Sequence, residues 1–277
     1  MIPHIYPVLS DSQHGFIKQR STSTNLFMYT HEIASHLDVG GQVDAIYTDF
    51  AKAFDRVDHG LLLCKLQSLH LPPTLISWFS TYLLNRPHIV SYQGQKSFVY
   101  HSTSGIPQGS NLGPLLFLIF INDAPFAITH SSCLLYADDL KIYRPVLCHN
   151  DSLLLQEDLD GLTTWCELNN LFLNIKKCQI ISFSRRQQLE TYDYHINGQP
   201  LMRSDSVKDL GVWYDSKLSF NKHVLPITSS SLKILGLITR CSRNFSKVST
   251  IITLFNLYVG SKLEYFFVIW YRKKSSV

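Results

Sequence analysis

The stretch Cys133–Tyr143 constrains the fold more than any other, because it places two adjacent acids inside an apolar pattern. An apolar run rises to Asp138 and Asp139, and apolar and polar residues alternate after them. This pattern predicts two strands joined by a tight turn that carries both carboxylates. Neighbouring carboxylates repel each other and are rare within strands, so the pair favours a bound divalent cation. A solvated polar turn is the alternative, because Asp is common in turns.

Length and composition describe a globular chain of one large domain or two lobes. The chain has 277 residues, of which 45% are hydrophobic and 17% charged, so it can bury a substantial core. Its longest purely apolar run, 115–121, is too short to span a bilayer, and no signal sequence begins the chain. The six cysteines lack CxxC pairs and zinc spacing, which indicates reduced thiols. We therefore expect no membrane contact and an intracellular location, in the nucleus, the cytoplasm or both.

Charge is unevenly distributed along the chain, although the net charge is only +4. Residues 203–277 carry twelve Lys and Arg against four Asp and Glu, whereas residues 1–202 carry thirteen against seventeen. A basic surface is common and need not bind anything. The same asymmetry is also expected if the basic part holds a polyanion on which the acidic part acts.

Hydrophobic periodicity and turn residues predict a mixture of helices and strands, with helices dominating the end of the chain. Helices are expected over residues 22–36, 58–69, 73–84, 115–126, 150–166, 221–238 and 251–258. Strands are expected over residues 43–50, 178–183, 192–196 and 207–214, besides the hairpin at 133–143. Expected helix caps are Thr22 or Thr24, Asp58, and Asn150 or Asp151.

A third acid, Asp49, ends the strand expected over 43–50. If this strand lies beside the hairpin, Asp49 converges with Asp138 and Asp139. Hard oxygen ligands without histidine or thiolate favour Mg²⁺ or Mn²⁺ over zinc. Two such ions, about 3.5–4 Å apart, would activate an attacking hydroxyl and neutralise a leaving pyrophosphate. Because Mg²⁺ binds through one or two carboxylates and substrate phosphates, the site should be complete only with a nucleotide bound.

Tyr136-Ala137-Asp138-Asp139 resembles the YxDD signature of reverse transcriptases. Four other stretches resemble motifs of the family, in its order and spacing. Residues 49–55 resemble the first catalytic-acid motif, and residues 105–114 the template and nucleotide loop. Residues 173–177 resemble the lysine-bearing motif, and residues 210–212 the primer grip. Residues 13–22 are similar to the fingers motif of non-LTR retrotransposons, nearest to jockey-like or chicken-repeat-like elements. Six motifs in register are far more specific than one YxDD.

The resemblance implies a role for each matching position. Asp49 and Asp138 would ligate the metal ions with the backbone carbonyl of Phe50, and Asp139 would complete the acidic cluster. The implied nucleotide-binding residues are Arg20, Phe54, Gln108, Gly109 and Lys177. The implied primer-grip residues are Leu210 and Gly211.

Several of these positions have a structural alternative. Phe54 matches the steric gate against the sugar 2′ position, and a core phenylalanine is the less favoured alternative. Arg20 suits a triphosphate, but it could be a surface arginine, and Lys176 could substitute for Lys177. Asp55 is interpreted as a cap or an ion-pair partner near the site, and Asp58 as a helix cap. Trp165 and Trp213 are interpreted as packing residues.

The resemblance implies an α+β, right-hand polymerase fold. Residues 1–42 would form partial fingers, 43–218 the palm, with inserted helices near 58–100, and 219–277 the start of a basic helical thumb. The implied activity is RNA-directed DNA synthesis, which extends a DNA primer on an RNA template with deoxynucleoside triphosphates and two Mg²⁺ ions, or Mn²⁺. The sequence does not define the oligomeric state.

The chain is also expected to be a fragment. It lacks the endonuclease domain and the first fingers segment that such elements carry, and it stops soon after Trp270, where the family continues. A truncated, non-catalytic remnant that binds RNA or primer–template through its basic end is therefore the main alternative. A nucleotide cyclase is disfavoured, because a cyclase needs no template loop.

Overall fold

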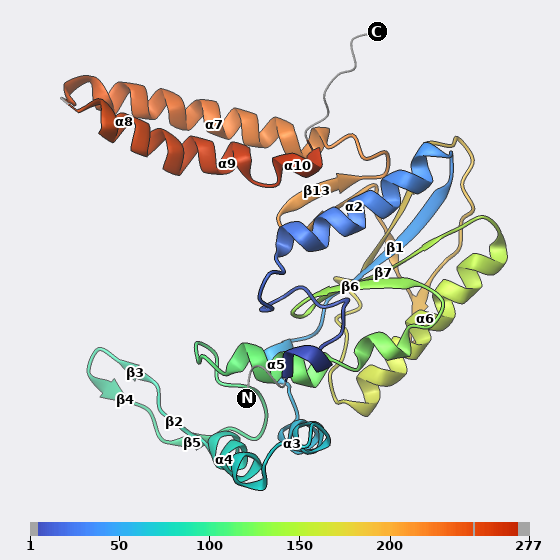
Figure 1. Ribbon diagram of the computed structural model, residues 1–277, viewed down its shortest axis with the longest axis vertical. Helices are drawn as coiled ribbons and strands as arrows, with labels where there is room; N and C mark the ends of the chain where they lie inside the picture. Colours follow the sequence, from blue (N-terminus) through green and yellow to red (C-terminus); the bar gives the residue numbers. More distant parts are fainter. Residues whose placement is uncertain (1–4, 246, 271–277) are drawn as a thin grey trace.

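A five-stranded sheet lies at the centre of the computed structural model, which describes residues 5–245 and 247–270 (Figure 1). In spatial order its strands are β11 (Met202–Arg203), β8 (Gln179–Ser184), β1 (Gln42–Thr48), β7 (Asp139–Pro145) and β6 (Ser132–Tyr136). All neighbours pair antiparallel except β11 and β8, which are parallel. The predicted strand at 43–50 is therefore central, with the predicted hairpin beside it.

Two hydrophobic cores lie on the two faces of this sheet, because side chains alternate along a strand. Val43 and Ala45 of β1 belong to the core under helix α2 (Thr22–Asp38). Ile46 belongs to the opposite core, with helices α5 (Gly113–Ile121) and α6 (His149–Leu168). Figure 1 shows α2 and α6 flanking the sheet. The apolar residues of the sheet are thus buried on both sides.

Tyr29 of α2 is the centre of the first core. Its ring, which is fully buried, makes edge contacts at centroid distances of 5.0–6.1 Å. The four partner rings are Tyr47, Tyr143, Phe183 and Tyr214. The Tyr47 hydroxyl donates a hydrogen bond to the Tyr29 hydroxyl over 2.7 Å, so the polar ends of these rings are also paired.

The chain between β1 and β6 forms one end of the molecule (Figure 1). It contains a 3₁₀ turn (Ala53–Asp55), helices α3 (His59–Ser68), α4 (Pro73–Leu83) and α5, and a 3₁₀ turn at Ala124–Ala127. Two small ladders project from it: β2 (Pro87–His88) with β5 (Tyr100–His101), and β3 (Ser91–Tyr92) with β4 (Gln95–Lys96).

The chain after β8 leads to the opposite end (Figure 1). Hairpins β9 (His195–Ile196) with β10 (Gln199–Pro200), and β12 (Ser206–Asp209) with β13 (Val212–Asp215), come first. The C-terminal helices follow: α7 (Asn221–Cys241), α8 (Val248–Phe255), a π-helical turn (Asn256–Gly260), α9 (Ser261–Glu264) and α10 (Phe267–Trp270). These helices and the β2–β5 region project from the same side of the sheet.

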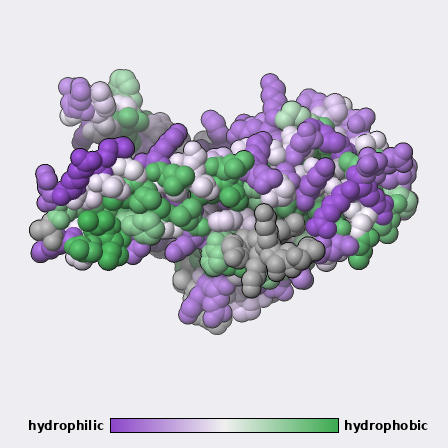
Figure 2. Space-filling model, turned by 90° about the horizontal axis from the view of Figure 1, so that it is seen from above, coloured by the Kyte–Doolittle hydropathy of each residue, from purple (hydrophilic) through white to green (hydrophobic). Residues whose placement is uncertain are grey.

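The projecting C-terminal arm carries many exposed apolar side chains (Figure 2). They include Leu225, Leu232, Leu237, Val248, Ile252 and Leu257. Among residues 5–245 and 247–270, every helix is too short or too polar to span a bilayer. Three basic residues that contribute to the predicted C-terminal charge excess, 272–274, lie outside the described residues.

Several local predictions were wrong. Ser21, rather than Thr22 or Thr24, is the N-cap of α2, and Thr24 completes a capping box with it. Helix α6 begins at His149 after the N-cap Cys148, because Asp151 accepts hydrogen bonds from main-chain N–H groups ahead of it. The strand predicted over 207–214 is interrupted by a turn at Leu210-Gly211, where both residues have positive φ. Asp58 is the N-cap of α3, as predicted.

Candidate active site

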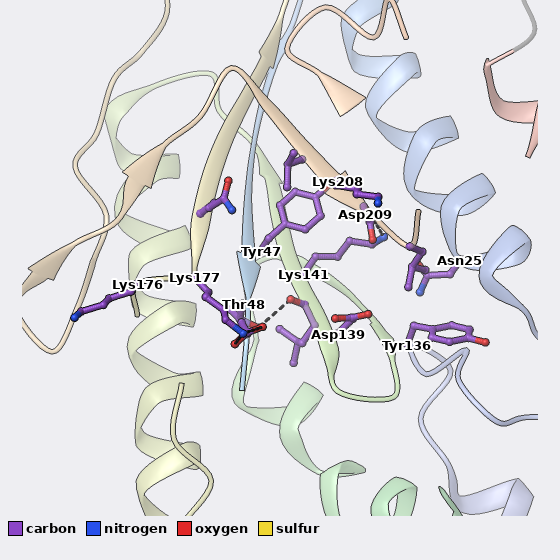
Figure 3. A pocket seen from close by; sticks show the side chains of 15 residues that line it. Asn25, Tyr47, Thr48, Tyr136, Asp139, Lys141, Lys176, Lys177, Lys208 and Asp209 are labelled. Carbon is purple, nitrogen blue, oxygen red and sulfur yellow. Dashed lines mark hydrogen bonds and ion pairs between the residues drawn. The ribbon is translucent and has the colours of Figure 1, made fainter. Parts of the chain in front are cut away.

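A pocket lies near the ends of β1 and β12 and the start of β7 (Figure 3). Its wall combines acids with lysines. The charged residues that line it are Asp49, Asp139, Lys141, Lys176, Lys177, Lys208 and Asp209. Of the three acids that the sequence singled out, Asp49 and Asp139 line this pocket, whereas Asp138 lies in the adjoining turn of the hairpin.

Strand register brings Asp49 to the hairpin. Thr48, the last residue of β1, pairs with Leu140 of β7. In an antiparallel ladder the residue after Thr48 and the residue before Leu140 lie at the same end, so Asp49 reaches the level of Asp139. The predicted side-by-side arrangement of the two strands is confirmed.

The hairpin has the predicted tight turn, but the turn carries Asp138 alone, because Asp139 is already the first residue of β7. Tyr136 pairs with Asp139, which leaves Ala137 and Asp138 as the turn. Ala137 has a φ of 56°, a left-handed conformation that is unfavourable for a residue with a Cβ atom. The chain can hold this conformation only if neighbouring contacts stabilise it.

The stretch 173–177 lies directly beside Asp49. Phe50 forms an isolated antiparallel bridge with Leu173, and the Asn174 N–H donates to the Asp49 carbonyl over 2.7 Å. The Lys177 ammonium is 3.4 Å from the Asp49 carboxylate. The hydrogen bonds of this bridge are made by the neighbours of Phe50: Asp49 accepts from Asn174, and Ala51 donates to Phe172. The Phe50 carbonyl takes no part in the bridge. In Figure 3, Lys176 extends away from the acids.

Burial and repulsion from neighbouring carboxylates both raise the pKa of Asp138 and Asp139. Desolvation, followed by the charge of Asp49, raises the pKa of Asp138. Desolvation and the charge of Asp138 raise the pKa of Asp139 to about 6, although part of its side chain is exposed. A bound cation would relieve this repulsion, so the electrostatics fit a divalent ion.

The donor set fits such an ion only in part before substrate binds. The three acids offer hard oxygen atoms, which suit a magnesium-type cation. Within residues 5–245 and 247–270, however, no group of three Asp, Glu, His or Cys side chains is close enough to hold an ion alone. This agrees with a site that takes its remaining oxygen ligands from substrate phosphates and water.

A buried ion pair forms the back of the pocket. Lys141 points from β7 to Asp209 at the end of β12, and the side chains of the two are 4% and 6% exposed (Figure 3). The Lys141 ammonium also lies 4.3 Å from the centre of the Tyr29 ring. The pair thus connects the hairpin, helix α2 and the strand before Leu210.

Comparison with known proteins agrees with the chemistry that the acidic pocket indicates. Residues 1–238 match the family described as "Reverse transcriptase (RNA-dependent DNA polymerase)". The chain belongs to the reverse transcriptase family. It is similar to the RNA-directed DNA polymerase from mobile element jockey of Drosophila melanogaster, with 32% identity over 227 residues, which cover 78% of this chain and 24% of that protein. A probable RNA-directed DNA polymerase from transposon BS of the same species is 30% identical over 230 residues, which cover 80% of this chain and 25% of that one.

Solved structures agree on the right-hand polymerase fold. The chain is similar to telomerase from Candida tropicalis in complex with a fragment of telomeric RNA, with a TM-score of 0.55 and 11% identity over 96% of this chain and 46% of that one. Telomerase without RNA from the same species gives a TM-score of 0.53 at 10% identity, with 94% and 47% covered. The α+β, right-hand fold predicted from the sequence is confirmed.

The reverse transcriptase motifs differ in how close they come to the acids. Leu210 lines the pocket, and its carbonyl accepts a hydrogen bond from the Tyr265 hydroxyl over 3.0 Å. A Cβ atom on Gly211 would lie 3.0 Å from the same hydroxyl. Gln108 lies in a second pocket, where its amide donates to Asp55 over 2.8 Å. Gly109 follows it with a φ of 75°. The Leu210-Gly211 turn therefore adjoins the acidic pocket, whereas Gln108 lines a separate pocket.

Two residues predicted to contact nucleotide make structural contacts. The Phe54 ring is half-buried and stacks on Phe117, with 4.2 Å between ring centroids. The Arg20 guanidinium donates to the carbonyls of Ser10, Asp11 and Gln13 and pairs with the Asp11 carboxylate at 2.7 Å. The structure does not bring Arg20 into the acidic pocket. Both nucleotide roles stay predictions.

Sequence reasoning missed the pocket's ion pair and two hairpin contacts. An isolated lysine inside an apolar strand was the available signal for Lys141. Gln13 and Asn25 gave no comparable signal, although both are buried and donate to main-chain oxygens of the hairpin. Their partners lie more than a hundred residues away, where no local pattern can indicate them.

The raised pKa of Asp139 predicts a pH-dependent cost in the metal-free protein. When the pKa of a carboxyl is higher in the folded than in the unfolded protein, the free energy of unfolding falls as pH rises from the unfolded to the folded value. We expect Asp139→Asn, measured by chemical denaturation with a chelator present, to raise the free energy of unfolding at pH 8 by about 1 kcal/mol, after a discount for exposure. The gain should disappear near pH 4.

Asp160→Asn on the exposed face of α6 serves as the control, with an expected change below about 0.5 kcal/mol. A gain for Asp139→Asn that is equally large at pH 4 and pH 8 would contradict charge repulsion as its cause.

The buried pair predicts strong coupling between Lys141 and Asp209. Asp209→Asn leaves a buried ammonium without its anion and should cost about 3–5 kcal/mol. The double variant Lys141→Met/Asp209→Leu replaces the pair by apolar groups and should lie within about 1 kcal/mol of wild type. Denaturation of the wild type, Lys141→Met, Asp209→Leu and the double variant measures the coupling, because the single variants of the cycle carry the same substitutions as the double variant. Additive losses would show that the two charges do not interact.

Proposed function

We propose that this chain supplies the polymerase domain of a non-LTR retrotransposon RNA-directed DNA polymerase. The observation that carries the proposal is the convergence of Asp49 with the Asp138-Asp139 hairpin, beside Lys177 and the Leu210-Gly211 turn. The relatives named for mobile elements support the substrate class. The chain spans about a quarter of the length of those relatives, so the activity, substrates and partners of the whole protein are part of the proposal.

The proposed reaction is nucleotidyl transfer to a DNA primer on an RNA template. The primer 3′-oxygen attacks the α-phosphorus of a deoxynucleoside triphosphate and forms the new P–O bond. The bond from the α-phosphorus to the bridging oxygen breaks, and pyrophosphate leaves with its electron pair. The proton of the primer hydroxyl passes to solvent or a nearby base.

We propose two Mg²⁺ ions, or Mn²⁺, as the metal ions of the site. Asp49, Asp138 and the carbonyl of Phe50 would hold them, with Asp139 completing the acidic cluster. When bound, they would supply Lewis-acid stabilisation of the charge that develops on the phosphate oxygens. The hard oxygen donors and the repulsion between the carboxylates support this assignment.

The remaining residues bind and orient the substrates in this proposal. Lys177, beside Asp49, would neutralise the triphosphate and donate a proton to leaving pyrophosphate. Phe54 would lie against the sugar, Gln108 and Gly109 would line the base, and Arg20 would grip phosphate. Leu210 and Gly211 would hold the primer end.

The proposal includes a division of the chain into partial fingers (1–42), palm (43–218) and the start of a thumb (219–277). The outermost residues of the first and last parts lie outside the described residues. Helix α2 packs on the palm sheet, so at least this part of the first segment is continuous with the palm core. Lysines and arginines of the last segment would hold primer–template phosphates, in the nucleus, the cytoplasm or both.

A primer-extension assay on an RNA template with Mg²⁺ tests the function. Wild type should extend the primer, and Asp138→Asn should lower the rate about a hundredfold or more, because the charge that holds the cation is lost. Asp160→Asn, far along α6, should leave the rate unchanged.

Extension that survives Asp138→Asn would contradict the metal assignment. If wild type fails to extend any primer but binds RNA in a salt-sensitive way, the non-catalytic remnant is the better account.

A further inference from the structure

The side chain of Gln13 holds the turn that carries Asp138. Its amide is buried, with 3% of the residue exposed. The side-chain oxygen of Gln13, Oε1, accepts hydrogen bonds from the main-chain N–H groups of Ala137 (2.9 Å) and Gly15 (2.7 Å). The Gln13 amide nitrogen donates to the Ala137 carbonyl over 3.3 Å. One side chain therefore satisfies both main-chain polar groups of the residue before Asp138.

We propose that Gln13 is a positioning residue of the catalytic hairpin. By bonding both peptide groups of Ala137, it stabilises the left-handed turn and so sets the direction in which the Asp138 carboxylate leaves the chain. The expected effect of Gln13 on catalysis rests on the proposed polymerase function. Its hydrogen bonds to Ala137 rest on the geometry alone.

The conformation of Ala137 explains why the turn needs such support. Its φ of 56° is sparsely populated by residues other than glycine, asparagine and aspartate. A two-residue turn without further contacts would relax toward less strained conformations. Asp138 follows directly, so any rotation of the Ala137 peptide moves the Asp138 carboxylate.

The main chain around Gln13 is itself fixed to the hairpin. Gln13 bridges Leu135 as a short parallel strand: the His14 N–H donates to Leu135, and the Leu135 N–H donates to Ser12, each over 2.9 Å. β6 is the edge of the sheet, so this segment covers an edge that would otherwise be open. Asn25 of α2 adds a third hydrogen bond to the Leu135 carbonyl, over 3.0 Å.

Two neighbours of Gln13 fit the same role. A Cβ atom on Gly15 would lie 2.4 Å from the Ala137 nitrogen, so only glycine allows this close approach. The Arg20 guanidinium donates to the Gln13 carbonyl over 2.7 Å and to two carbonyls before it. The segment predicted as a fingers motif therefore forms a fixed support for the palm hairpin.

The test compares Gln13→Met with wild type. Methionine has a similar shape but makes none of the three hydrogen bonds. We expect the Ala137 amide to exchange with solvent at least about tenfold faster in the metal-free variant, because its acceptor is gone, while β1 amides remain protected. We expect kcat for primer extension to fall about tenfold or more, with KM for the nucleotide and Kd for primer–template within about twofold.

The double variant Gln13→Met/Ala137→Gly separates positioning from general stability. Glycine adopts positive φ without a Cβ penalty, so the turn needs less support and part of the kcat should return. Gln67→Met on the exposed face of α3 is the matched control and should change neither quantity.

Unchanged exchange of the Ala137 amide in Gln13→Met would overturn the inference, as would an unchanged kcat. A fall in activity that follows lost thermal stability and is not relieved by Ala137→Gly would also overturn it, in favour of simple packing. A wild type that extends no primer would instead contradict the proposed function, and the exchange measurement would still decide whether Gln13 holds the turn.

Discussion

The pairing of β1 with β7 is the constraint on which the rest of the site depends. Thr48 opposite Leu140 sets Asp49 level with the hairpin that carries Asp138 and Asp139. A slip by one residue would turn Val43 and Ala45 out of their core, because side chains alternate along a strand. The two cores therefore fix the register, and the register fixes the distance between the acids.

Carboxylates that repel each other need a rigid frame, and the frame is built from contacts of long sequence separation. The Lys141–Asp209 pair and the ring of Tyr29 hold the back of the pocket. Gln13 holds the turn from the other side. The same contacts thus stabilise the fold and fix the geometry of the site. A substitution that weakens one of them is expected to lower stability and to displace the acids.

Local patterns predicted much of this molecule. The apolar-acid-apolar pattern at 133–143 predicted the hairpin, and the position of Asp49 after a β-rich run predicted its neighbour. Both follow from backbone periodicity. The caps of α2 and α6 were misplaced by one to three residues, because several polar residues there compete for the same N–H groups. The turn at Leu210-Gly211 was missed because its flanks read as one continuous strand. The contacts of Gln13, Asn25 and Asp209 depend on tertiary packing and have no local signature.

Cleavage of the main chain by Fe²⁺ bound in place of Mg²⁺ tests the central claim most directly, because the radicals formed at the ion cut only nearby peptide bonds. If the β1–β7 register joins the acids into one cation site, cuts should appear both beside Asp49 and beside Asp138-Asp139, and excess Mg²⁺ should suppress them together. Cuts beside only one of these segments, or cuts that Mg²⁺ does not affect, would contradict the account.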